Sequence, residues 1–178
     1  LFNAVENYKS GIQKKLIVYS IPNHDAIQLV YGKESLMISD SGFNANDRKI
    51  QFHIQSNLWS LNSNCSFINY NEMADNYKTE TIFFHKNFIQ FCNKKIILIK
   101  DNASVPMHSQ KDKLEIDYAI YCNNANPELG RIADNMNVKN IIISSVKNNW
   151  TRKQIESYCK EMKINFFDVK NKAVILKI

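Results

Sequence analysis

The chain is organised around the segment from Lys15 to Gly42, which reads KLIVYSIPNHDAIQLVYGKESLMISDSG. It contains three short apolar runs that are rich in β-branched residues, and turn-forming residues separate them. The runs cover Leu16–Tyr19, Ala26–Val30 and Leu36–Ile38. Runs of this length between Pro, Gly, Asn and Asp predict a meander of three antiparallel strands. Asp40 follows the last run, and functional side chains are common at such strand ends because a rigid sheet holds them in place.

The composition is that of an ordinary globular chain with a mild positive charge. The 178 residues suit one domain, and 44% of them are hydrophobic. The net charge of +6 permits nucleic acid or an anionic membrane as a partner without selecting either. No apolar run is long enough to span a membrane. The cysteines form no C-x-x-C pair, and although their even number allows disulfides, buried free thiols fit the apolar surroundings of Cys92 and Cys122 better.

The rest of the chain predicts a mixture of strands and helices. Apolar residues recur at helical spacing between Asn46 and Leu61. Further strands are predicted at Ser66–Ile68, Thr81–Phe84, Phe88–Phe91, Ile96–Ile99, Leu114–Tyr121 and Ile141–Ile143, and further helices at Pro127–Met136 and Thr151–Met162. The last two runs, Phe166–Val169 and Ala173–Leu176, are expected to pair with each other. Antiparallel hairpins followed by alternating strands and helices predict an α/β fold.

Four segments, taken in order, carry a resemblance to a known family of domains. Ser20–Ala26 reads SIPNHDA where members read D-V-G-Q-G-D-A, and Ile38–Gly42 reads ISDSG where they read I-D-T-G. Ile97–Asp101, ILIKD, stands in place of L-L-T-G-D, and Cys122–Asn126, CNNAN, in place of P-H-H-G-S. In the order of these motifs and in its strand pattern, the chain from residue 15 to residue 178 resembles the metallo-β-lactamase-like domain that ends ComEC-type competence proteins.

This resemblance implies a reduced metallo-β-lactamase-like αββα sandwich over residues 15–178, with residues 1–14 as a lead-in or linker from a preceding membrane region. ComEC-type proteins are the DNA-uptake channels of naturally transformable bacteria. The degenerate motifs are most similar to the Bacteroidetes-type version. The first residue is not Met, which fits a piece cut from a larger protein. We expect a membrane-associated parent protein that carries this domain on the periplasmic side, and the piece alone to be soluble.

The hydrolytic members of that family bind two metal ions, and this chain lacks most of the ligands that the resemblance implies. Members use an H-x-H-x-D-H loop, a later His and a bridging Asp, which together hold a metal-bound water of lowered pKa. No two histidines here lie within four residues of each other; they are His24, His53, His85 and His108. We therefore expect a degenerate active site with no catalytic residue, no metal and no cofactor. Its vestigial positions are Asp40, Asp101, Asn123 and Asn124.

These acidic and imidazole side chains also have plain structural explanations. Asp40 fits a turn carboxylate that accepts backbone N–H bonds from Ser41 or Gly42, and Asp101 fits the start of a loop. Each histidine fits a surface or partly buried position without a metal.

A basic, aromatic segment at the start of the last predicted helix is the candidate DNA contact. Lys147, Trp150, Arg152 and Lys153 combine positive charge with an aromatic ring, as surfaces that bind single strands do. The N-terminus of that helix could also receive a phosphate. The alternative is that Trp150 packs at the rim of the core and that the charges are solvated.

The prediction is thus a non-catalytic domain of a competence-related DNA-uptake channel, with a role in DNA binding or in channel assembly. The expected partners are the transmembrane channel portion of the same parent chain and single-stranded DNA, and no small-molecule substrate is evident. Two alternatives remain open. One is a metal-dependent phosphodiesterase or nuclease with an atypical site, and the other is a protein-interaction module without a nucleic-acid role.

Overall fold

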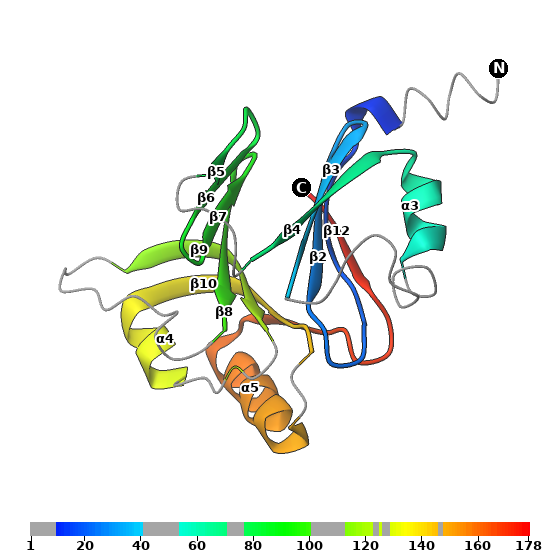
Figure 1. Ribbon diagram of the computed structural model, residues 1–178. Helices are drawn as coiled ribbons and strands as arrows, with labels where there is room; N and C mark the ends of the chain where they lie inside the picture. The colour runs from blue at the N-terminus through cyan, green and yellow to red at the C-terminus, as the bar shows by residue number, and fades with distance from the viewer. Residues whose placement is uncertain are drawn as a thin grey trace. The chain divides into compact units, whose positions relative to one another are not determined.

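The fold consists of two compact units, each built around its own β-sheet (Figure 1). A computed structural model describes residues 10–40, 54–70, 77–100, 113–122, 125, 129–145 and 148–178. One unit joins Leu1–Met73 to the last segment, Asn171–Ile178, and the other covers Ala74–Lys170. The boundary expected between residues 1–14 and 15–178 stays a prediction.

The first unit contains the predicted meander. Its described strands are β1 (Lys14–Val18), β2 (Ala26–Tyr31), β3 (Glu34–Ser39), β4 (Asn64–Asn69) and β12 (Val174–Lys177), in the sheet order β12-β1-β2-β3-β4. The β1–β2 and β2–β3 pairs are antiparallel, which confirms the meander. β4 is longer than the predicted strand and runs parallel to β3, so the crossover between them includes a helix.

That helix, α3 (Gln55–Leu61), covers one face of the first sheet. Ile54 and Leu61 pack with Ile17 of β1, and Leu58 packs against the same cluster. The helical stripe predicted from the sequence is confirmed for these residues, whereas its first part, residues 46–53, lies outside the described residues. A partly buried hydrogen bond fixes the helix further, because Asn57 Nδ2 donates at 2.8 Å to the Oη of Tyr19, the residue that directly follows β1.

The second unit contains a longer, mixed sheet. Its described strands are β5 (Tyr77–Lys78), β6 (Ile82–His85), β7 (Phe88–Phe91), β8 (Lys94–Ile99), β9 (Leu114–Tyr121), β10 (Met136–Ile143) and β11 (Asn165–Asp168), in the order β11-β10-β9-β8-β7-β6-β5. β5 to β8 form antiparallel pairs, and β8 to β11 form parallel pairs. Ile96–Ile99 is buried on both faces of β8, as predicted for a central strand.

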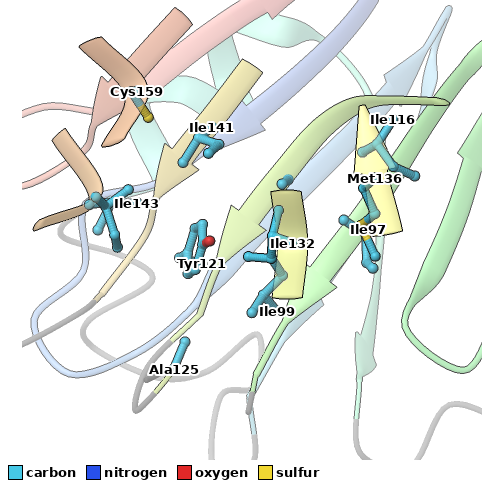
Figure 2. Packing of buried hydrophobic residues seen from close by; sticks show 12 residues of the cluster. Ile97, Ile99, Ile116, Tyr121, Ala125, Ile132, Met136, Ile141, Ile143 and Cys159 are labelled. Carbon is cyan, nitrogen blue, oxygen red and sulfur yellow. The ribbon is translucent and has the colours of Figure 1, made fainter. Parts of the chain in front are cut away.

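Two helices, α4 (Leu129–Asn135) and α5 (Asn149–Met162), cover one face of this second sheet, in yellow and orange in Figure 1. Figure 2 shows Ile141 and Ile143 of β10 on the side of the sheet where α5 carries Cys159. Asn148 caps α5, because its Oδ1 accepts the N–H of Trp150 at 2.9 Å. Met162 was expected on the apolar face of this helix, but it is half exposed at the last turn.

Two expectations about the last third of the chain were wrong. The strands at 165–168 and 174–177 do not pair with each other: β11 lies beside β10, and β12 lies beside β1 in the other sheet. A strand that follows a crossover helix returns parallel to its predecessor, which takes β11 to β10. The second helix was expected to reach Met136, but this residue begins β10 because its side chain belongs to the core of the sheet.

The tight turn between β2 and β3 gives a first test of this fold. Gly32 has φ +57°, and a Cβ added there would lie 3.0 Å from the Gly11 carbonyl oxygen. We expect Gly32→Ala to lower the free energy of unfolding by about 1–2 kcal/mol, because an L side chain is strained in this conformation. Urea denaturation followed by circular dichroism measures the change.

The matched control for this test is Gly130→Ala in α4. An added Cβ meets no atom within 4 Å there, and alanine favours a helix over glycine by up to about 1 kcal/mol. Equal effects of the two substitutions would contradict the account of the turn.

Candidate functional site

Asp40 lies just beyond β3 and contacts the turn between β1 and β2. Its Oδ1 is 2.9 Å from His24 Nδ1, and its Oδ2 accepts the backbone N–H of Asp25 at 3.3 Å. Both side chains of the His24–Asp40 pair are largely buried. The bonds expected from Ser41 and Gly42 fall outside the described residues. The structure therefore gives Asp40 a local role in joining the end of β3 to the β1–β2 turn, with partners that the sequence did not predict.

Asp25, beside this pair, is a fully buried carboxylate. Tyr70, which directly follows β4, donates its hydroxyl to Asp25 Oδ2 at 3.1 Å. A buried carboxylate must be hydrogen-bonded, since desolvation otherwise costs several kcal/mol. This network of His24, Asp25, Asp40 and Tyr70 orients an imidazole and holds the ends of three strands together.

One contact of this network, between Asp25 and Asp40, could have been predicted from the sequence. The two-residue turn of the β2–β3 hairpin pairs Tyr31 with Glu34, and the pairs continue to Ala26 with Ser39. One more step along the hairpin brings residue 25 opposite residue 40. The register of a predicted hairpin was therefore enough to bring Asp25 to Asp40, whereas Tyr70 arrives only through the parallel β3–β4 pair.

A metal centre does not emerge from the part of the chain that the structure describes. No three His, Cys, Asp or Glu side chains gather there in a way that could hold a metal ion. Asp101, Asn123 and Asn124 lie outside the described residues, as do His53 and His108. The four cysteines are free thiols; Cys122 and Cys159 are buried, and Cys65 and Cys92 are half-buried.

Parallel strands of the second sheet end together at one edge, where open α/β sheets commonly bind ligands. Hydrogen bonds continue past the strand ends there, from Cys122 N–H to Ile99 O at 2.9 Å and from Ser144 N–H to Tyr121 O at 2.9 Å. In the sequence, Asp101 follows β8 by two residues and Asn123 follows β9 by two. Three of the four positions that the resemblance marked as vestigial therefore follow strands that end at this edge.

Two buried hydroxyls near that edge, those of Tyr121 and Ser144, are not satisfied within the described structure. Tyr121, at the end of β9, lies among apolar side chains between Ile143 and Ile132 (Figure 2). Its Oη finds no hydrogen-bond partner there. Burial raises the pKa of this phenol, and the ionisable side chains of Tyr158 and Cys159 raise it further. Tyr121 is therefore a neutral phenol that packs as a core residue.

The exposed face of α5 carries two of the candidate DNA contacts. Trp150 is 63% exposed, which favours an accessible ring over packing at the rim of the core. Trp150 and Lys153 line one shallow hollow of about 410 Å³, together with Tyr158 and Glu161. The structure thus combines an aromatic ring with a cation, and an acidic side chain lines the same hollow.

Arg152 points elsewhere. Its guanidinium forms an ion pair with Asp168 Oδ1 at the end of β11, and the side chain is mostly buried. Asp168 Oδ1 also accepts the N–H of Lys170 at 2.8 Å. Arg152 therefore fastens α5 to β11, while Lys147 lies outside the described residues.

A comparison with protein families gives a match to the ComEC C-terminal domain over residues 16–178. The chain belongs to the ComEC C-terminal domain family. This confirms the family that the four motifs indicated, over nearly the same residues. Membership links the chain to competence-related DNA uptake and to a membrane-protein context. Comparisons with curated proteins and with solved structures gave no match.

The architecture of this ComEC C-terminal domain is mixed α/β, with two mixed sheets and few helices in its described part. Across the described residues, no helix combines the length and the apolar character that crossing a bilayer requires.

The Asp25 network gives a second prediction. Tyr70→Phe removes the hydroxyl that donates to the buried Asp25 carboxylate, so we expect the free energy of unfolding to fall by about 1–3 kcal/mol. Urea denaturation at neutral pH measures this loss. Tyr31→Phe is the control, because Tyr31 is an exposed tyrosine of the same unit and should change stability by less than about 0.5 kcal/mol. Similar losses in both variants would argue against a stabilising Tyr70–Asp25 bond.

Proposed function

We propose that this ComEC C-terminal domain serves DNA uptake as a non-catalytic module that binds single-stranded DNA. The observation that carries the proposal is the exposed Trp150 ring beside Lys153 on α5. Surfaces for single strands use an aromatic ring to stack a base and a cation to contact the backbone. An exposed indole suits an unpaired base, because the bases of a duplex already stack on one another. Glu161 lines the same hollow, so we expect the strand to pass closer to Lys153.

The non-catalytic part of the proposal is supported by the residues at the motif positions. The segment in place of P-H-H-G-S has Asn123 and Asn124 instead of imidazoles. His24 is hydrogen-bonded to Asp40 through Nδ1, so this pair serves the β1–β2 turn. A catalytic metal site needs about three protein ligands, with one position open for water.

The proposed setting is a larger membrane protein. We propose the transmembrane channel portion of the same parent chain as the second partner, and the periplasmic side as the location of the domain. A role in channel assembly is compatible with DNA binding. If the purified chain fails to bind single strands even at low salt, a protein-interaction module becomes the better proposal.

We also propose the reduced metallo-β-lactamase-like αββα sandwich as the fold. Helices cover one face of each sheet. The other face of each sheet is also apolar and buried, with Leu29 and Ile38 in the first sheet and Leu98 and Ile142 in the second. A second apolar face on each sheet is what a sandwich architecture requires. An experimental structure in which other segments cover these faces would refute this proposal.

Variants on α5 test the DNA contact. We expect Trp150→Ala to weaken binding of a fluorescent oligo-dT by about 5- to 150-fold, the range for losing one stacked base. A plot of log affinity against log salt has a negative slope. Lys153→Gln should reduce the magnitude of this slope by about 0.7, the value for one phosphate contact on a single strand. Fluorescence anisotropy at several salt concentrations measures both effects.

The matched control is Arg152→Gln, which removes one positive charge from the same helix. Because Arg152 is paired with Asp168, we expect this variant to lose stability but to keep the salt slope. An equal loss of slope in both variants, or full affinity in Trp150→Ala, would contradict the proposed contact.

Metal content separates this proposal from the nuclease alternative. We expect elemental analysis of the purified chain to find less than one bound metal ion per molecule. We also expect no cleavage of single- or double-stranded DNA in manganese or zinc, with a chelator-treated sample as the control. Stoichiometric metal together with DNA cleavage that the chelator abolishes would establish an atypical metal-dependent phosphodiesterase instead.

A further inference from the structure

The first unit has a larger hollow, which the sequence motifs did not indicate. It has a volume of about 930 Å³ and lies between the start of β1, the end of β12 and the last turn of α3. Its lining includes Ile12, Gln13, Lys14, Lys15, Trp59 and Lys177. A hollow of this size is at the upper end of the range of about 300–1,000 Å³ that small-ligand sites occupy.

The charge of this hollow favours an anion. Lys14, Lys15 and Lys177 line it, and none of the described lining residues is Asp or Glu. Lys15 and Lys177 stand directly opposite each other on neighbouring strands. Like charges in that arrangement destabilise a sheet, and an anion between them would relieve the repulsion. The pKa of Lys15 is lowered by burial and then by the charge of Lys177.

Gln13 organises the floor of the hollow. Its Nε2 donates to the carbonyl of Gly32 at 2.9 Å and to that of Leu61 at 2.7 Å, and its Oε1 accepts from Lys15 Nζ at 2.9 Å. The first two bonds occupy main-chain acceptors that would otherwise repel an anion. The third holds the Lys15 ammonium group in place. One amide therefore fixes a cation and satisfies two carbonyl groups.

Trp59 supplies a flat apolar surface beside these cations. Its side chain is 74% exposed, and its position on α3 is set by the bond from Asn57 to Tyr19 and by the N–H of Asn62, which donates to the Trp59 carbonyl at 3.2 Å. Lys14 also lines the hollow, and its Nζ lies 5.2 Å from the centre of the Tyr31 ring.

We propose that this hollow is a second binding surface for single-stranded nucleic acid, on which Trp59 stacks a base while Lys14, Lys15 and Lys177 contact phosphates. The combination of an exposed indole, three cations and a concave shape is what a flexible polyanion with unpaired bases requires. An anionic bilayer is flat and suits protruding side chains better than lysines that line a hollow. The surface shares its ligand with the proposed function but uses residues of the other unit.

The test compares variants of the whole 178-residue chain by fluorescence anisotropy with labelled oligo-dT. We expect Trp59→Ala to weaken binding by about 5- to 150-fold and Trp59→Phe to restore most of the affinity. A triple variant changes the three lysines of the hollow to glutamine, as Lys14→Gln, Lys15→Gln and Lys177→Gln. It should reduce the magnitude of the salt slope by about 2, the value for three phosphate contacts.

The matched control removes the same charge elsewhere, through Lys33→Gln, Lys78→Gln and Lys172→Gln, which change three exposed lysines that do not line the hollow. This control should keep most of the salt slope. Thermal unfolding of every variant checks that folding is retained, and Trp59 is exposed enough that its substitution should leave the fold intact.

Each possible result of these binding measurements supports or overturns the proposed second surface. Loss of affinity in Trp59→Ala with the control triple unaffected supports it, whether or not Trp150→Ala also binds weakly. Full affinity in Trp59→Ala, or equal slopes in the two triple variants, overturns it and leaves the α5 proposal standing if Trp150→Ala binds weakly. Binding to vesicles of anionic lipid that needs the three lysines, without binding to oligo-dT, overturns it in favour of a membrane surface. A wild-type chain that binds neither probe refutes both proposals.

Discussion

The two-residue turn at Gly32 and Lys33 is the constraint on which the first unit depends. It fixes the register of β2 against β3, and this register brings Asp25 opposite Asp40 at the far end of the hairpin. At the near end, the N–H of Gly32 donates to the carbonyl of Gln13 at 2.8 Å, which anchors the start of β1. One tight turn therefore positions both the Asp25–Asp40 contact and Gln13, because a shift of one residue would send every side chain to the opposite face.

Both tryptophans of the chain lie on helix surfaces and are largely exposed. Burying a tryptophan is among the most stabilising contributions that a side chain makes, so its exposure forgoes stability. Trp59 on α3 and Trp150 on α5 each have a lysine in the same hollow. Each unit therefore pairs an exposed aromatic ring with a cation, and the proposed binding of single strands rests on this pairing rather than on the net charge of the chain.

The carboxylates near the strand ends serve structure in the part of the chain that is described. Asp40 joins the end of β3 to the β1–β2 turn through His24 and Asp25, and Asp168 holds Arg152 at the end of β11. Each of these acids accepts two hydrogen bonds from nearby segments, which stabilises the strand ends. These described strand ends are thus cross-linked by hydrogen bonds and an ion pair.

Local periodicity and short motifs were enough to predict the meander, the central β8 strand and the family, because each of these is recorded in neighbouring residues. Tertiary structure alone decided that β11 and β12 belong to different sheets, since two short apolar strands carry no local record of their partners. It also decided which cations are accessible: Arg152 and Lys153 are neighbours in the sequence, yet one pairs with Asp168 and the other lines a hollow. Lys14 and Trp59 lie far apart in the sequence, and only the packing of α3 on β1 brings them to one surface.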